Sequence, residues 1–172
     1  EEIKLVDEFG NITMKLNEWA MFERYVEFRN RYPFEITLLE QTIISEELSV
    51  AGTLDRVIKL PSGELMLFDI KTSNAIYPSY WLQLAAYKEM LRSIHIEVDS
   101  VGILWLNAKT RTEGKNGAVQ GIGWQLVTKT DTSKEWKLFK ATQELWKAEN
   151  EDIKPRMNSY KLSYQLNQLQ KI

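Results

Sequence analysis

Residues 49–71 read SVAGTLDRVIKLPSGELMLFDIK, and this stretch decides the fold that we expect for the chain. Two runs rich in Val, Ile and Leu, at 49–60 and 64–71, flank a turn signal at 60–63 (LPSG). Apolar, β-branched runs separated by Pro and Gly are typical of paired strands. The stretch therefore predicts two neighbouring antiparallel strands, and the second run is apolar on both faces, as in a buried strand.

Two charged residues, Asp69 and Lys71, interrupt the second of these strands. Side chains alternate along a strand, so both residues share one face. Isolated charges in a buried strand need partners. If residues 61–63 form a three-residue loop, Asp55 on the first strand faces Asp69, with the two Cβ atoms roughly 5 Å apart. The pattern therefore predicts two carboxylates side by side in the sheet.

A strand predicted at 36–45 supplies a third carboxylate, Glu40. If residues 47–48 form a two-residue turn, Glu40 faces Asp55 from the other side. Under both registers Glu40, Asp55 and Asp69 line up across three strands. A register shifted by one residue would move a side chain to the opposite face, so the alignment depends on these two turns.

Opposed carboxylates destabilise a sheet unless something neutralises them. A divalent cation would do so, and it would lower the pKa of a bound water and so provide a nucleophile near neutral pH. Lys71 would then hold the hydroxide or stabilise charge on a phosphate. The alternative, that Asp55, Asp69 and Lys71 are exposed charges at a sheet edge, stays open on the residues alone.

Periodicity predicts the remaining elements. Three amphipathic or apolar helices are expected at 17–30, 78–92 and 132–149, and two further strands at 100–107 and 121–129. Asn17 is the expected N-cap of the first helix, and the apolar stripe of the last helix is expected to be Trp136, Phe139, Leu145 and Trp146. The order predicts one α/β domain over residues 1–172, with a mixed central sheet flanked by helices.

Composition narrows the chemistry. The chain has 172 residues, no cysteine and one histidine, His95. Thiolate zinc sites, iron–sulfur clusters and cysteine nucleophiles are thereby excluded, and His95 is expected at the surface. Carboxylates and backbone oxygens are hard ligands that favour Mg²⁺ or Mn²⁺. The formal net charge of −2 does not indicate a strongly basic nucleic-acid binder.

Three segments carry a resemblance to a known family. They are Gly52–Val57 (GTLDRV), Asp69–Ser73 (DIKTS) and Gln83–Tyr87 (QLAAY), preceded by Leu39-Glu40. Their order and spacing resemble the RecB-like branch of the PD-(D/E)XK nucleases, and within it the phage-type exonucleases and the mitochondrial genome maintenance exonuclease. The matching core spans about residues 36–90. The branch has a restriction-endonuclease-like fold, which is therefore the expected one here.

The resemblance implies a role for each matched residue. Asp55, Asp69 and the Ile70 backbone carbonyl would bind Mg²⁺ or Mn²⁺, with Glu40 as a further ligand or a group that positions water. Lys71 would be the catalytic lysine. The supporting or DNA-contacting residues would be Gln83, Tyr87 and Thr72. The first helix offers only Glu18, Glu23 and Glu27 where many relatives have a histidine or glutamate.

The resemblance implies a metal-dependent deoxyribonuclease, and most closely an exonuclease that requires a DNA end. A non-catalytic DNA-binding or scaffold member of the fold, an endonuclease and an RNA nuclease remain alternatives. No membrane span is visible, and we expect an intracellular, cytoplasmic protein of bacterial or phage origin. Whether the substrate is single-stranded or duplex stays open, as do homo-oligomers and recombination or replication partners.

The segment 108–120 is expected to be a loop with three basic residues, Lys109, Arg111 and Lys115. These residues either contact the nucleic-acid backbone or form a solvated hairpin tip. Two tryptophans, Trp81 and Trp105, are candidates to stack on bases, although either could instead belong to the core.

Overall fold

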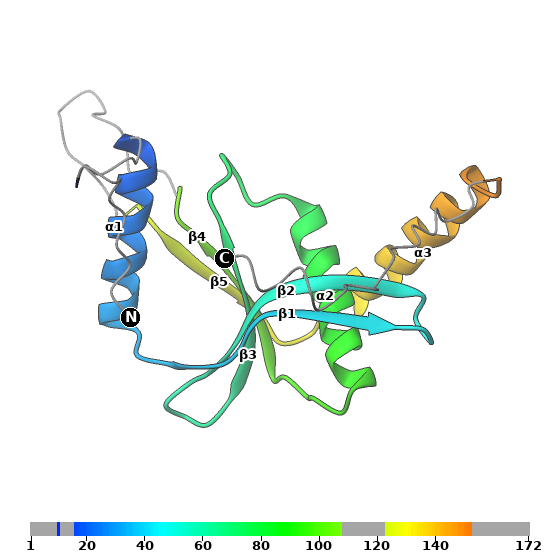
Figure 1. Ribbon diagram of the computed structural model, residues 1–172, viewed down its shortest axis with the longest axis horizontal. Helices are drawn as coiled ribbons and strands as arrows, with labels where there is room; N and C mark the ends of the chain where they lie inside the picture. Colours follow the sequence, from blue (N-terminus) through cyan, green and yellow to red (C-terminus); the bar gives the residue numbers. More distant parts are fainter. Residues whose placement is uncertain (1–9, 11–15, 108–122, 153–172) are drawn as a thin grey trace, which may run out of the picture.

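The computed structural model describes Gly10 and residues 16–107 and 123–152. Its elements follow the order predicted from the sequence, helix, three strands, helix, two strands, helix (Figure 1). They are α1 (Leu16–Arg31), β1 (Glu35–Ser45), β2 (Val50–Lys59), β3 (Leu65–Lys71), α2 (Pro78–Ser93), β4 (Ser100–Trp105), β5 (Gln125–Lys129) and α3 (Ser133–Glu149).

The strands form one mixed five-stranded sheet in the order β1-β2-β3-β4-β5. Three neighbouring pairs are antiparallel, and only β3 and β4 run parallel. A parallel pair needs a long crossover, and α2 provides it between β3 and β4. This is the mixed α/β architecture predicted from the sequence, and it is consistent with a restriction-endonuclease-like fold.

The β2–β3 hairpin has the predicted register. Arg56 pairs with Phe68, so the next position along brings Asp55 opposite Asp69. The turn is closed by hydrogen bonds from Gly63 N to Leu60 O (2.8 Å) and from Leu60 N to Glu64 O (2.9 Å). The predicted three-residue loop at 61–63 is therefore confirmed.

The β1–β2 register is also the predicted one, but the turn is longer. Ser45 pairs with Val50, and the turn spans residues 46–49 rather than 47–48. Lengthening the turn by one residue on each side leaves the pairing unchanged. Gln41 pairs with Leu54 and Leu39 with Arg56, which places Glu40 and Asp55 at the same level.

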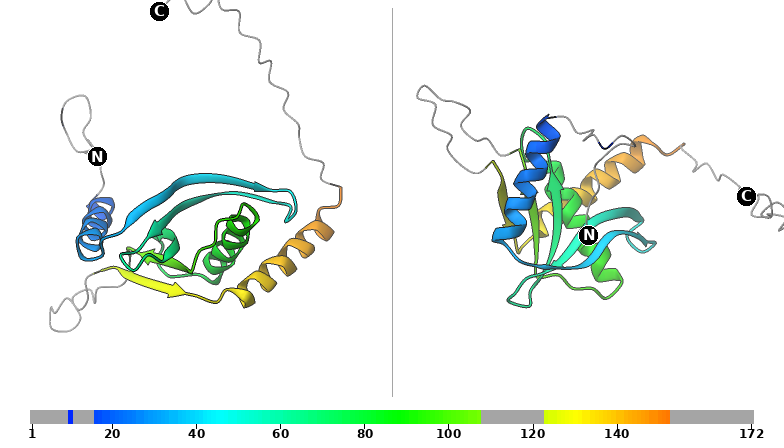
Figure 2. Two further views of the ribbon diagram at one scale, coloured as in Figure 1. Left: turned by 90° about the horizontal axis from the view of Figure 1, so that it is seen from below. Right: turned by 60° about the vertical axis from the view of Figure 1, so that its left-hand side comes forward.

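Two cores cover the two faces of the sheet. Alternation along β3 sends Leu67 to one core, with α2, and Met66 and Phe68 to the other, with Phe28 of α1. Figure 2 shows β1 and β2 arching over α2, with α3 beside α2 and α1 on the other side of the sheet. Asp69 and Lys71 lie on the same face of β3 as Leu67, and Lys71 contacts Gln83 of α2.

Two predicted details of the helices were wrong. α1 begins at Leu16, so Asn17 lies within the helix and is not its N-cap. No described side chain of α3 is buried. Leu145 and Trp146, expected in its apolar stripe, are 59% and 57% exposed, because α3 extends beyond the sheet and covers α2 only with its first turns (Figure 1).

No helix in the part of the chain that the structure describes is long and apolar enough to cross a membrane.

Candidate active site

Asp69 is the buried charge at the centre of the site. It lies near the end of β3, and only 3% of the residue is exposed. Asp55 lies opposite it on β2 and is half-buried. Asp55 Oδ2 accepts a hydrogen bond from the Ile70 backbone N–H (3.1 Å). This bond ties the Asp55 side chain to β3 beside Asp69, so the two predicted aspartates are brought together.

Lys71 is the cationic partner of Asp69. Its Nζ lies 2.8 Å from Asp69 Oδ2, but the approach is that of an ion pair, and this buried oxygen has no hydrogen-bond partner within the described residues. Lys71 Nζ also donates to Gln83 Oε1 (3.3 Å) and lies 4.6 Å from the centre of the Tyr80 ring. The ammonium is thus held by α2 as well as by its own strand.

Burial controls the protonation of Asp69. Removal from water raises the pKa of this carboxyl from 3.8 to about 6, Lys71 lowers it, and Asp55 raises it further. Burial is the largest of these influences, because an ionised carboxylate loses its hydration there. At pH 7 the carboxylate form still predominates by roughly ten to one. The site therefore holds an ionised carboxylate that one lysine only partly compensates.

Residues of α2 support the site from behind. Gln83 Nε2 donates to the Tyr87 hydroxyl (3.1 Å), and a Cβ placed on Gly52 of β2 would lie 2.6 Å from Tyr87 Cε1. Only glycine therefore lets β2 approach the tyrosine ring. Contacts between Lys71 and Gln83, between Gln83 and Tyr87, and between Tyr87 and Gly52 thus connect the three sequence segments that carry the family resemblance. Gln83 and Tyr87 are four residues apart on α2 and therefore share one helix face.

The expected convergence of Glu40 with the two aspartates is not present. Glu40 is exposed, and its backbone adopts a left-handed φ of 45°, which breaks the alternation of β1 at this position. Among the described residues, no group of three or more Asp, Glu, His or Cys side chains is arranged to hold a metal. The register is right, but the left-handed backbone at Glu40 departs from the regular strand geometry on which the alternation argument depends.

The remaining candidate residues that the structure describes lie outside the cluster formed by Asp55, Asp69 and Lys71. Thr72 and His95 are exposed. Trp81 belongs to the core under α2 and is not free to stack on a base. Trp105 is half-buried, and its indole N–H donates to Ser73 O (2.7 Å). Three basic residues expected to contact DNA lie outside the described residues, namely Lys109, Arg111 and Lys115.

Sequence reasoning missed Tyr80. This residue lies three positions before Gln83 and seven before Tyr87 on α2, so all three share one helix face. Helical spacing from the Gln83–Tyr87 pair could have identified it. Its ring face accepts the Lys71 ammonium, a cation–π contact that steadies the lysine without neutralising it.

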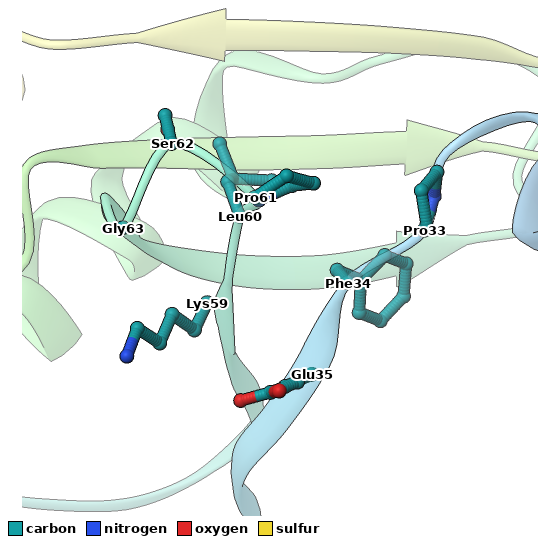
Figure 3. Close-up of a pocket in the computed structure, with 8 residues that line it drawn as sticks. All are labelled: Pro33, Phe34, Glu35, Lys59, Leu60, Pro61, Ser62 and Gly63. Carbon is teal, nitrogen blue, oxygen red and sulfur yellow. The ribbon is translucent and has the colours of Figure 1, made fainter.

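A separate cavity lies away from these residues. It has a volume of about 570 Å³ and is lined by residues 33–35 and 59–63 (Figure 3). These residues surround the β2–β3 turn, at the opposite end of β3 from Asp69. The cavity contains one carboxylate and one ammonium, from Glu35 and Lys59 of paired strands. It has none of the predicted site residues.

The donor set at Asp69 fits a hard divalent cation. Asp69 Oδ2 is buried and has no hydrogen bond, and a second carboxylate, Asp55, lies opposite it on the neighbouring strand. Mg²⁺ and Mn²⁺ prefer such oxygen ligands. The Ile70 carbonyl lies on the backbone between Asp69 and Lys71. These atoms could hold a cation and offset the repulsion between the two carboxylates.

No protein-family model matches the chain, and neither does any curated protein. The chain is similar in structure to a protein from Eubacterium rectale that is provisionally named an exonuclease, with a TM-score of 0.46 and 12% identity, over 97% of this chain and 70% of that one. It is also similar to SSO0001, with a TM-score of 0.35 and 11% identity, over 76% and 59% of the two chains.

Proposed function

We propose that this chain is a metal-dependent deoxyribonuclease that uses Asp55, Asp69 and Lys71. One observation carries the proposal. A buried carboxylate, Asp69, is paired with the single ammonium of Lys71 at 2.8 Å and lies opposite a second carboxylate, Asp55. Two neighbouring carboxylates that share one lysine repel each other, and a carboxyl with a raised pKa in such a cluster is typical of a functional site.

Each residue has a distinct task in this proposal. Asp69, Asp55 and the Ile70 carbonyl would hold Mg²⁺ or Mn²⁺, which when bound polarises a phosphate oxygen and lowers the pKa of a coordinated water. Lys71 would orient the attacking water and stabilise negative charge that develops on the phosphate. Gln83 and Tyr80 would keep the Lys71 ammonium in place. Glu40 could join only through a rearrangement of its backbone.

We further propose that the enzyme acts at a free DNA end. A formal net charge of −2 leaves little basic surface to grip the interior of a long duplex. Only 3% of Asp69 is exposed, so a phosphate of a flexible end would reach it more readily than one in the middle of a stiff duplex. The resemblance of the three sequence segments to exonucleases supports the same substrate.

One plasmid tests both parts of the proposal. Covalently closed and linearised forms are incubated with Mg²⁺, with Mn²⁺ and with EDTA. We expect degradation of the linear form only, and no degradation in EDTA. Comparable nicking of the closed circle would identify an endonuclease, whereas intact DNA under every condition would contradict a nuclease. The double variant Asp55→Asn/Asp69→Asn controls for contaminating activity.

A further inference from the structure

β1 is an open edge of the sheet. Within the described residues it pairs with β2 alone, so the N–H and C=O groups that face away from β2 have no partner strand there. Natural sheets keep such edges short or protect them with Lys or Pro. β1 is 11 residues long and contains neither (EITLLEQTIIS). It is therefore an edge on which another strand can add.

The side chains and charges of β1 define what would fit this edge. Three of its large apolar side chains, Ile36, Leu39 and Ile44, are exposed by 42%, 56% and 71%. Residues 35–49, which comprise β1 and its turn to β2, contain four glutamates and no lysine or arginine. An added strand would bury apolar side chains against those of β1, and a basic strand would be attracted by the glutamates. The edge therefore suits an extended segment with alternating apolar residues and positive charge.

A segment of this kind follows α3 in the sequence. Residues 160–167 (YKLSYQLN) alternate strictly between apolar and polar side chains, and the apolar ones are Tyr160, Leu162, Tyr164 and Leu166. A period of two over such a length predicts a half-buried strand. Residues 156–172 carry three basic residues and no acidic one. This segment lies outside the described residues, so the strand is a prediction from the sequence, and its charge is complementary to that of β1.

The end of the described chain lies within reach of β1. Gln143 Nε2 of α3 donates to two carbonyls of the β1–β2 turn (3.1 Å each), so α3 passes the end of β1 (Figure 2). The helix ends at Glu149, roughly 9 Å beyond this contact. Residues 153–159 can span up to roughly 24 Å when extended, which is enough to return to Ser45, the last residue of β1. A chain that returns there and continues along the edge runs antiparallel to β1.

We propose that residues 160–167 pair antiparallel with β1 as a sixth strand of the sheet. The inference goes beyond the proposed function and does not depend on it. Attachment to the same chain favours this partner, because a short linker gives an effective concentration on the order of millimolar, whereas a second copy has to lose its translational freedom. The other edge strand, β5, fits less well, since it has only 5 residues and its single charge, on Lys129, repels a basic segment.

Hydrogen exchange of the full chain, read by mass spectrometry, tests this pairing. In the parent we expect the N–H groups of residues 35–45 that face away from β2 to be protected from exchange. Leu162→Pro removes a backbone donor and fixes φ, so it disrupts a strand at this position. Exchange of the edge N–H groups should then accelerate on the order of tenfold. The measurement requires no cleavage, so its outcome is separate from that of the proposed function.

The matched control is Asn158→Pro, which places the same residue in the linker before the predicted strand and should leave the exchange of β1 unchanged. Peptides from β3 and β4 should exchange at the parent rate in both variants, because neither strand neighbours β1. Rapid exchange along the edge of β1 in the parent would overturn the inference. Equal protection in the parent and in Leu162→Pro would overturn it as well, because something other than this segment would then cover the edge.

Light scattering identifies the source of the added strand. We expect the same molar mass for the parent and for Leu162→Pro, because the segment pairs within its own chain. A dimer in the parent that dissociates in Leu162→Pro would show that the segment pairs with β1 of a second copy, and it would overturn the proposal.

Discussion

The ammonium of Lys71 lies 2.8 Å from Asp69 Oδ2, and the two residues occupy alternate positions at the end of β3. Between them, Ile70 faces the other side of the sheet, and its N–H is bonded to Asp55. Three consecutive residues of one strand thus contribute a carboxylate, a backbone anchor and a cation. In the part of the chain that the structure describes, Lys71 is the single cation beside the two carboxylates, so a divalent cation would offset the repulsion that remains between them.

Asp69→Asn should abolish DNA cleavage and raise the stability of the metal-free protein at neutral pH. The pKa of Asp69 is raised from 3.8 to about 6 in the folded protein. The folded state therefore binds this proton more tightly than the unfolded state, and stability is lost as pH rises through about 6. Removing the charge should recover up to about 2–3 kcal/mol in the free energy of unfolding.

The sign of this effect can be checked by urea unfolding in EDTA. At pH 7.5 the Asp69→Asn variant should unfold at a higher urea concentration than the parent, and the difference should shrink as pH falls below 6 towards 4. Excess Mg²⁺ should reduce the difference in stability between variant and parent at pH 7.5, because it binds and stabilises the parent alone. A variant less stable than the parent at pH 7.5 in EDTA would contradict the conclusion that burial of the Asp69 charge destabilises the folded protein.

Lys71→Ala should abolish cleavage and leave Mn²⁺ binding largely intact. Lysine does not coordinate the metal in the proposed site, and its removal leaves all oxygen ligands present. Calorimetric titration with Mn²⁺ should give similar affinities for variant and parent. Lys59→Ala, at the other end of the same hairpin, removes an exposed lysine and should retain full activity. Turnover near that of the parent in Lys71→Ala would show that its assigned role is wrong.

Gly52→Ala should destabilise the protein through Tyr87. The added Cβ would lie 2.6 Å from the tyrosine ring, and overpacking of this kind costs about 1–3 kcal/mol. In a Tyr87→Ala background the same substitution should cost much less, because the ring is gone. Chemical denaturation of the two single variants and the double variant measures this coupling. If the stability losses of the two single variants simply add up in the double variant, Gly52 and Tyr87 are not energetically coupled.

Neutralising Lys109, Arg111 and Lys115 together should weaken DNA binding and flatten its dependence on salt. Each phosphate contact releases counterions, so losing contacts lowers the slope of log affinity against log salt concentration. Neutralising three exposed lysines elsewhere, Lys59, Lys134 and Lys140, produces the same change in net charge and serves as the control. Equal slopes for the two triple variants would favour the alternative that the 108–120 segment is a solvated tip.

Several features of the site were predictable because they depend on local spacing. The paired aspartates follow from a strand period of two and a three-residue loop, and the register confirmed them. The Gln83–Tyr87 contact follows from helical spacing. Glu40 shows where this reasoning stops. Its register was predicted correctly, but the left-handed backbone at φ 45° is a local departure from alternation that no pattern of apolar residues reveals.

The sequence by itself determined the order of the elements, the mixed sheet with its helices and the face shared by Asp69 and Lys71, since hydrophobic periodicity and turn chemistry are local properties. Only the tertiary structure decided what depends on contacts between distant segments. Burial under α2 raises the pKa of Asp69, and α2 supplies the Gln83 and Tyr80 side chains that hold its partner Lys71. Packing of α2 against the sheet places Trp81 in the core, and the extension of α3 beyond the sheet exposes Trp146. Composition cannot assign these environments, because each is created by residues far away in the chain.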